Sequence, residues 1–144
     1  MKKRTRGREI ALQFLYQQDL VGGILDSPED RLPAFLAEVE GDQAACDFAR
    51  RLIHGVLSER ELIDERIQSV AQNWEIERMA IVDRNVLRVA AYELLHLDDI
   101  PPKVAINEAI ELGKRFSTQN SGGFINGVLD KIKERYSPKN GAKS

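Results

Sequence analysis

Three residues near the C-terminal end of the sequence have types and spacing that suit single-stranded nucleic acid. Phe124 is followed by Lys131 and Arg135, at spacings of seven and eleven residues. In a helix, successive side chains lie about 100° apart, so all three share one flank outside the apolar sector. An aromatic ring there can stack on a base, and the cations can follow a phosphate backbone. The alternative is that Phe124 covers the core edge and the cations are a solvated face.

A second cationic group lies at the start of the chain. The first nine residues hold five cations against the single acid Glu9, and the cations are Lys2, Lys3, Arg4, Arg6 and Arg8. A helix N-terminus carries partial positive charge and normally attracts acids. Phosphate would use both the helix dipole and the cations, so the pattern predicts a phosphate-binding segment. The alternative is a disordered basic tail without a role.

Residue types that carry catalysis or bind metal form no motif. His54 and His96 stand outside any HExxH or Cys/His spacing, and Cys46 is the only cysteine. Glycine-rich phosphate loops are absent, and Ser117 and Ser121 lack the sequence of a nucleophile elbow. We therefore expect a protein that is not an enzyme and has no metal and no cofactor.

Apolar periodicity predicts the helices that position these residues. Apolar side chains recur at helical spacing, and no stretch alternates with the period of a strand. The helices are expected over about residues 6–21, 28–40, 45–57, 62–74, 79–95, 102–116 and 124–136. A break is predicted at Gly22 and Gly23, an exposed loop over 117–123, and a polar tail over 137–144.

These helices predict an all-α fold of about seven helices in one domain, residues 1–136. We expect two packed sub-bundles, about residues 4–74 and 75–136. Segments 45–57 and 62–74 should form a tight antiparallel hairpin. The strongly apolar segment 79–95 should be the central helix of the second half. Trp74, between two helical segments, is expected to be a core or junction residue rather than a stacking surface.

Composition places the chain among globular proteins of a reducing compartment. It has 144 residues and a formal net charge of −2. Residues 19–65 hold twelve acids and four arginines, a charge of −8. This segment would repel a polyanion, so nucleic acid is expected to contact only a limited part of the surface. No segment resembles a secretory signal, and no apolar run reaches the ~20 residues of a membrane span. We expect a cytoplasmic protein without membrane contact.

Four segments together resemble the bacterial NusB family. They are REIALQFLYQQDL, RLIHGVLSERELIDERI, NWEIERMAIVDRNVLRVAAYELLHLDDIPPKVAINEAIELGKRF and SGGFINGVLDKI. The resemblance covers residues 4 to 135, and the last two segments are the most specific. It implies an all-helical fold without catalysis. It also implies binding of boxA RNA together with the ribosomal protein NusE, in an RNA polymerase antitermination complex on ribosomal RNA operons.

The resemblance also assigns positions. The family's arginine-rich start corresponds to Lys2 to Arg8, and its base-contacting phenylalanine corresponds to Phe124. The turn associated with the NusE-facing surface corresponds to Asp83 and Arg84. Many relatives have Asp where this chain has Asn120, which is expected to favour RNA binding here. Gly123 stands where many have Lys or Arg, which is expected to weaken it.

Other interpretations follow from the same fold. A helical adaptor or oligomer that never contacts RNA would keep the surface around Asp83. The fold also forms the N-terminal module of ribosomal-RNA cytosine methyltransferases, but 144 residues are expected to leave no room for a methyl-donor domain. Relatives with this fold are monomers or dimers, so a homodimer stays open.

Overall fold

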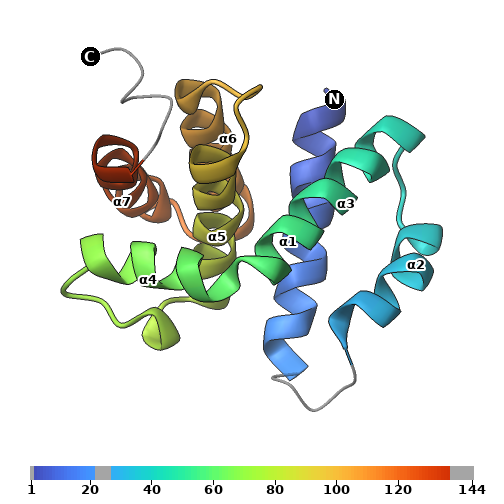
Figure 1. Ribbon diagram of the computed structural model, residues 1–144, viewed down its shortest axis with the longest axis horizontal. Helices are drawn as coiled ribbons and strands as arrows, with labels where there is room; N and C mark the ends of the chain where they lie inside the picture. Colours follow the sequence, from blue (N-terminus) through green and yellow to red (C-terminus); the bar gives the residue numbers. More distant parts are fainter. Residues whose placement is uncertain (1, 22–26, 137–144) are drawn as a thin grey trace.

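The computed structural model describes residues 2–21 and 27–136, and this part of the chain is helical and connecting segments throughout (Figure 1). The predicted break at Gly22 and Gly23 and the predicted tail over 137–144 lie outside the described residues. The elements are α1 (Lys3–Val21), α2 (Pro28–Glu38), α3 (Gln43–Ser58), α4 (Arg60–Val70), η1 (Ile76–Arg78), α5 (Ile81–His96), α6 (Pro102–Phe116) and α7 (Ser121–Tyr136). The all-α prediction is confirmed. No helix among these is long and apolar enough to cross a membrane.

Helix starts follow local chemistry. Asp42 caps α3 by accepting a hydrogen bond from the Ala45 backbone N–H at 2.8 Å. Pro102 occupies the first position of α6, where its missing N–H costs nothing, and the Pro101 carbonyl accepts from the Ala105 N–H at 3.1 Å. The two prolines therefore open a helix, as the sequence predicts.

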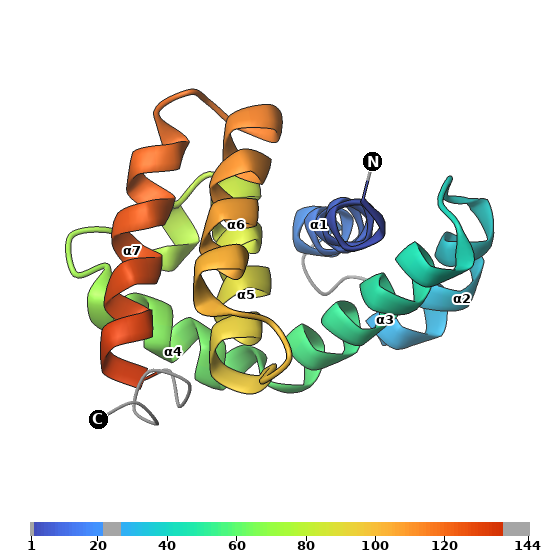
Figure 2. The same cartoon turned by 90° about the horizontal axis from the view of Figure 1, so that it is seen from above.

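The helices divide into two groups, and the division differs from the predicted one. Figures 1 and 2 show α1, α2 and α3 on one side and α4 to α7 on the other. Only Glu59 separates α3 from α4, and α4 leads away from α3 to pack on α5 and α7. The predicted antiparallel hairpin is therefore wrong, and the boundary near residue 74 moves to Glu59. Apolar periodicity identifies both helices but does not determine the direction of the bend between them.

Helix α5 is the centre of the molecule. It packs against α1, α3, α4, α6 and α7, so it contacts both groups. Val86, Leu87, Ala91 and Leu94 are each fully or nearly fully buried. Burial of such side chains, at about 25 cal/mol per Å² of apolar surface, is the main stabilising contribution. The predicted central helix is confirmed, and it joins the two halves rather than serving one.

Helices α6 and α7 approach closely at a glycine. A Cβ on Gly113 would lie 2.4 Å from Cδ1 of Ile125, so a larger residue would push α7 away. The predicted loop between them is shorter than expected, because α7 begins at Ser121 rather than after Gly123. The Ser121 hydroxyl is buried, lies 3.1 Å from the Thr118 hydroxyl and donates to Ser117 Oγ at 3.1 Å. These short-range bonds allow the helix to start within a segment that has turn-forming composition.

Candidate nucleic-acid and protein interface

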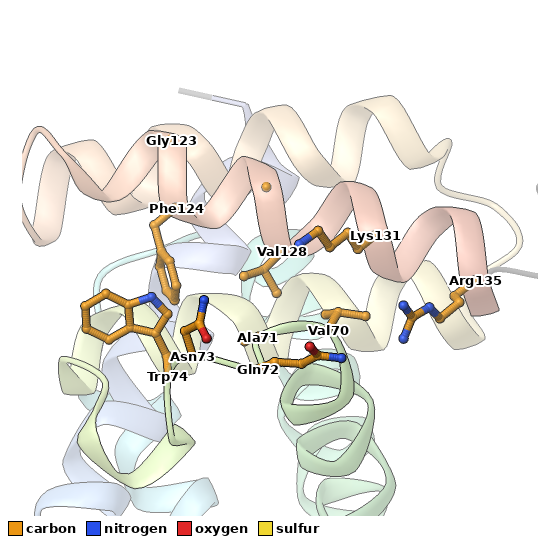
Figure 3. Close-up of a pocket in the computed structure, with 11 residues that line it drawn as sticks. Val70, Ala71, Gln72, Asn73, Trp74, Gly123, Phe124, Val128, Lys131 and Arg135 are labelled. Carbon is orange, nitrogen blue, oxygen red and sulfur yellow. The ribbon is translucent and has the colours of Figure 1, made fainter.

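The three residues predicted to share a flank line one hollow. Phe124, Lys131 and Arg135 project from α7 over the segment that follows α4 (Figure 3), and the hollow between them measures about 410 Å³. Phe124 is half-buried, whereas Lys131 and Arg135 are exposed. Arg135 also makes a long contact, 3.4 Å, with the Ser69 carbonyl oxygen. The predicted geometry is confirmed: one ring and two cations share a solvent-facing hollow.

Trp74 lies opposite Phe124 in the same hollow (Figure 3). Trp74 is 57% exposed, so of the predicted core or junction positions it occupies the junction, between α4 and η1, and not the core. The reason is the chain direction, because α4 ends at Val70 and Trp74 follows in a turn outside the helix. The two rings meet edge to face, with centroids 6.0 Å apart and planes at 70°. Sequence periodicity treated Trp74 as the last residue of a helix and so missed this pair.

A second hollow lies on the other side of the same two rings. It measures about 220 Å³ and is lined also by Met79, Asp83 and Asn120. One carboxylate oxygen of Asp83, Oδ1, is buried and has no hydrogen-bond partner among the described residues. Asp83 and Asn120, which the sequence assigned to a protein surface and an RNA surface, are therefore neighbours.

A third hollow lies where α1, α5 and α6 meet, and sequence analysis did not identify it. It measures about 340 Å³ and is lined by Leu12, Tyr16, Val82 and Phe116, with Arg6 and Glu9 at its margin. Phe116 is 46% exposed, although it ends an amphipathic helix. Val82 adjoins Asp83 of the second hollow in sequence. The only sequence signal was an aromatic residue at a helix end beside turn-forming residues.

The N-terminal cations do not form the tail that was one alternative, because α1 begins at Lys3. Arg8 is 2% exposed, and its Nη2 donates to Glu93 Oε1 at 2.6 Å while its Nη1 donates to Glu108 Oε1 at 3.1 Å. The guanidinium also lies 5.2 Å from the centre of the Phe48 ring. The prediction that Arg8 contacts RNA is corrected, since its donors are used inside the protein.

The other N-terminal cations are nearer the surface. Lys2 and Lys3 are exposed. Arg4 is half-exposed and donates to Asp99 Oδ2 at 3.1 Å, and Arg6 donates through Nε to the Glu40 carbonyl oxygen at 2.8 Å. Arg6 lines the third hollow, whereas Lys131 and Arg135 line the first.

Arg84 also has an internal partner. Its Nε and Nη2 donate to the two carboxylate oxygens of Asp19 at 2.7 and 2.8 Å, and its side chain is 14% exposed. Asp19 accepts further hydrogen bonds from Asn85 and Arg88. Burial raises the pKa of Asp19, but these hydrogen bonds and charges outweigh it and hold the pKa at about 2. The prediction that Arg84 contacts a protein partner is therefore corrected, because its guanidinium is paired with Asp19. Asp83, in contrast, lines the second hollow.

The remaining candidates of the sequence do not build a catalytic or metal site. His54 and His96 are exposed, and the His96 ring lies 5.2 Å from that of Tyr92. Among residues 2–21 and 27–136, no three His, Cys, Asp or Glu side chains are grouped so as to hold a metal ion. The fold and the surface define an all-helical protein with exposed rings, exposed cations and an apolar hollow.

Comparisons with known proteins identify the family. The NusB family model matches residues 5–134. The transcription antitermination protein NusB of Anaeromyxobacter dehalogenans strain 2CP-1 is 49% identical over 130 residues, which cover 90% of this chain and 89% of that protein. The same-named protein of Desulforapulum autotrophicum is 46% identical over 135 residues, with 92% of each chain covered. The chain belongs to the NusB family.

Solved structures agree with this assignment. T. maritima NusB superposes with a TM-score of 0.85 at 37% identity, covering 100% of this chain and 99% of that one. A structure of the antitermination factors NusB and NusE in complex with dsRNA superposes with a TM-score of 0.81 at 28% identity, covering 94% and 99%. The predicted fold and family are confirmed, and both relatives carry the name transcription antitermination protein NusB.

Proposed function

We propose that this chain is an RNA-binding transcription antitermination factor of the cytoplasm. It binds boxA-type single-stranded RNA of nascent ribosomal RNA transcripts, together with a NusE-type ribosomal protein, in an RNA polymerase antitermination complex. The observation that carries the RNA part is the Phe124 ring, half-exposed in one hollow with Lys131 and Arg135. Such a combination binds single strands through stacking and phosphate contacts.

The N-terminal cations extend the proposed RNA contact. Lys2, Lys3 and Arg4 are exposed near the start of α1, where the helix dipole adds to their attraction for phosphate. Arg6 lines the third hollow, and Val82 of that hollow is next in sequence to Asp83 of the second. The exposed cations at the start of α1 therefore support an RNA contact in addition to the one on α7.

The proposed protein contact uses the third hollow and Asp83. An exposed Phe116 beside Val82 and Tyr16 forms an apolar surface of the kind that protein partners cover. Asp83 adds an acidic group next to it, which suits a partner surface that carries positive charge. The solved complex of NusB and NusE with dsRNA supports the binding of RNA and of a NusE-type protein by a chain of this family.

Phe124→Ala tests the RNA proposal, with Ile125→Ala as the matched control from the same helix turn. Phe124 is half-buried, so we expect a stability loss smaller than the about 3–5 kcal/mol of a buried phenylalanine. RNA binding should weaken by about 1–3 kcal/mol, the contribution of one stacked base. Ile125 is 0% exposed, so its truncation should cost about 2–5 kcal/mol of stability without changing the affinity of the folded protein.

Urea unfolding and titration with a labelled boxA-type 12-mer RNA measure the two effects separately. The titrations are run with and without the NusE-type protein. A wild-type protein that binds the ribosomal protein but no RNA in either titration would support the adaptor alternative. A large stability loss in Phe124→Ala with RNA affinity intact would assign Phe124 to the core.

A further inference from the structure

Trp74 is an exposed aromatic residue that lines the same hollow as Phe124. It is the only tryptophan of the chain, and 57% of it is exposed. Exposure of a large apolar ring to water is unfavourable, so folding alone does not explain its position. Its backbone and its neighbours show that the position is held rather than free.

Gln68 holds the turn that carries Trp74. Its Nε2 donates to the carbonyl oxygens of Ala71 at 3.2 Å and of Trp74 at 2.8 Å. Its Oε1 accepts from the Ile76 backbone N–H at 2.9 Å. The Trp74 N–H also donates to the Ala71 carbonyl oxygen at 3.0 Å. The segment is therefore fixed on both sides of Trp74 without burying the indole, so a ligand would meet an ordered ring.

Trp74 and Phe124 form a ridge between two hollows. Both rings line the hollow of about 410 Å³ and the hollow of about 220 Å³ on its other side. Lys131 lines the first hollow and Arg78 the second, so each side has a cation for a phosphate. Arg78 is 80% exposed in its side chain and contacts Glu75 at 3.4 Å, which leaves most of its guanidinium in solvent.

We propose that Trp74 is a second stacking surface, which takes the base next to the one on Phe124. This rests on the RNA binding proposed above and specifies how the strand lies at the aromatic pair. The ring planes meet at 70°, so bases stacked on them cannot stack on each other. The strand is therefore unstacked and sharply turned between two consecutive nucleotides. A base-paired duplex cannot adopt that arrangement.

Tryptophan emission tests the contact directly, because a single indole reports on a single site. The probe is an unlabelled U-rich 12-mer RNA, with a duplex of equal length as control, and affinity is measured in parallel by anisotropy of labelled RNA. We expect the single strand to quench Trp74 emission with the same midpoint as binding. The duplex should not quench it.

Substitutions separate stacking from other roles. Trp74→Leu keeps an apolar side chain but no stacking surface, and we expect it to weaken single-strand binding by about 5- to 150-fold. Trp74→Phe should restore most of the affinity. Because the indole is exposed, both variants should melt near the wild type. Gln68→Leu frees the turn, so it should weaken binding less than Trp74→Leu and reduce the quenching at saturation.

The outcomes separate this inference from the proposed function. Wild-type protein that binds no RNA in the anisotropy titration overturns both. RNA binding with unchanged emission and equal affinities for wild type and Trp74→Leu overturns only the second stacking surface. An emission change that requires the NusE-type protein and not RNA also overturns it, because it assigns Trp74 to a protein contact.

Discussion

Replacing Arg8 separates the folding role of the basic N-terminal segment from its proposed RNA role. Arg8 lies in α1, and its carboxylate partners Glu93 and Glu108 lie in α5 and α6, so its hydrogen bonds join the two groups of helices. The Arg8 and Glu93 side chains are 3% and 1% exposed. Arg8→Met keeps the length of the stem and removes the charge.

The expected stability loss follows from the burial of the remaining carboxylate. Removing one member of a buried ion pair costs about 3–5 kcal/mol, because the other charge stays buried and loses that counter-ion. The substitution also removes the cation–π contact between Arg8 and the Phe48 ring. We count this smaller contribution within the about 3–5 kcal/mol. Domains of this size have total stabilities of about 5–15 kcal/mol. Arg8→Met should therefore lower the urea midpoint strongly. The variant should keep only a small free energy of unfolding.

The assay is urea unfolding followed by circular dichroism at pH 7, with Lys3→Gln as the exposed control. Lys3→Gln should change the unfolding free energy by less than about 0.5 kcal/mol. The double variant Arg8→Met with Glu93→Gln should lose less than the sum of the single losses, because the buried charge is removed with its partner. If Arg8→Met unfolds like the wild type but binds RNA with a reduced salt dependence, Arg8 is a phosphate contact and the reasoning is refuted.

Three further expectations follow from the structure. The pKa of Asp19 is about 2 in the folded protein against an ordinary 3.8, so its contribution of about 2 kcal/mol is present above pH 4 and is lost as pH falls toward 2. Urea unfolding over that range should show a smaller pH dependence for Asp19→Asn than for wild type, and equal slopes would contradict the assignment. Asp83→Lys should weaken binding of the NusE-type protein in calorimetry, with helical content unchanged. If the variant and the wild type bind with equal affinity, the interface does not include Asp83. Lys2→Gln with Lys3→Gln should lower the salt slope of RNA binding by up to about 1.4, which is about 0.7 for each phosphate that a lysine no longer neutralises; an unchanged slope would exclude both lysines.

The spacing of apolar residues along the sequence was enough to predict most of the helices and the side of α7 on which the site lies. The apolar spacing of Ile125, Val128, Leu129 and Ile132 identified the buried face of α7, and all four are buried. Because the angle between successive helical residues is constant, that face also located Phe124 off the core on the side of Lys131. A helix can be read in this way from its own residues.

Contacts between distant residues decided the rest. Arg8 and Arg84 have the composition of surface cations, yet their carboxylate partners lie 85 and 65 residues away in sequence. Trp74 continues an apolar pattern but follows the end of α4 and faces solvent. Helical periodicity determines which side of a helix is apolar, but neither where a helix bends nor which helix lies against it. Those features depend on packing across the whole chain, so only the tertiary structure separated the buried cations from the exposed ones and brought Trp74 to Phe124.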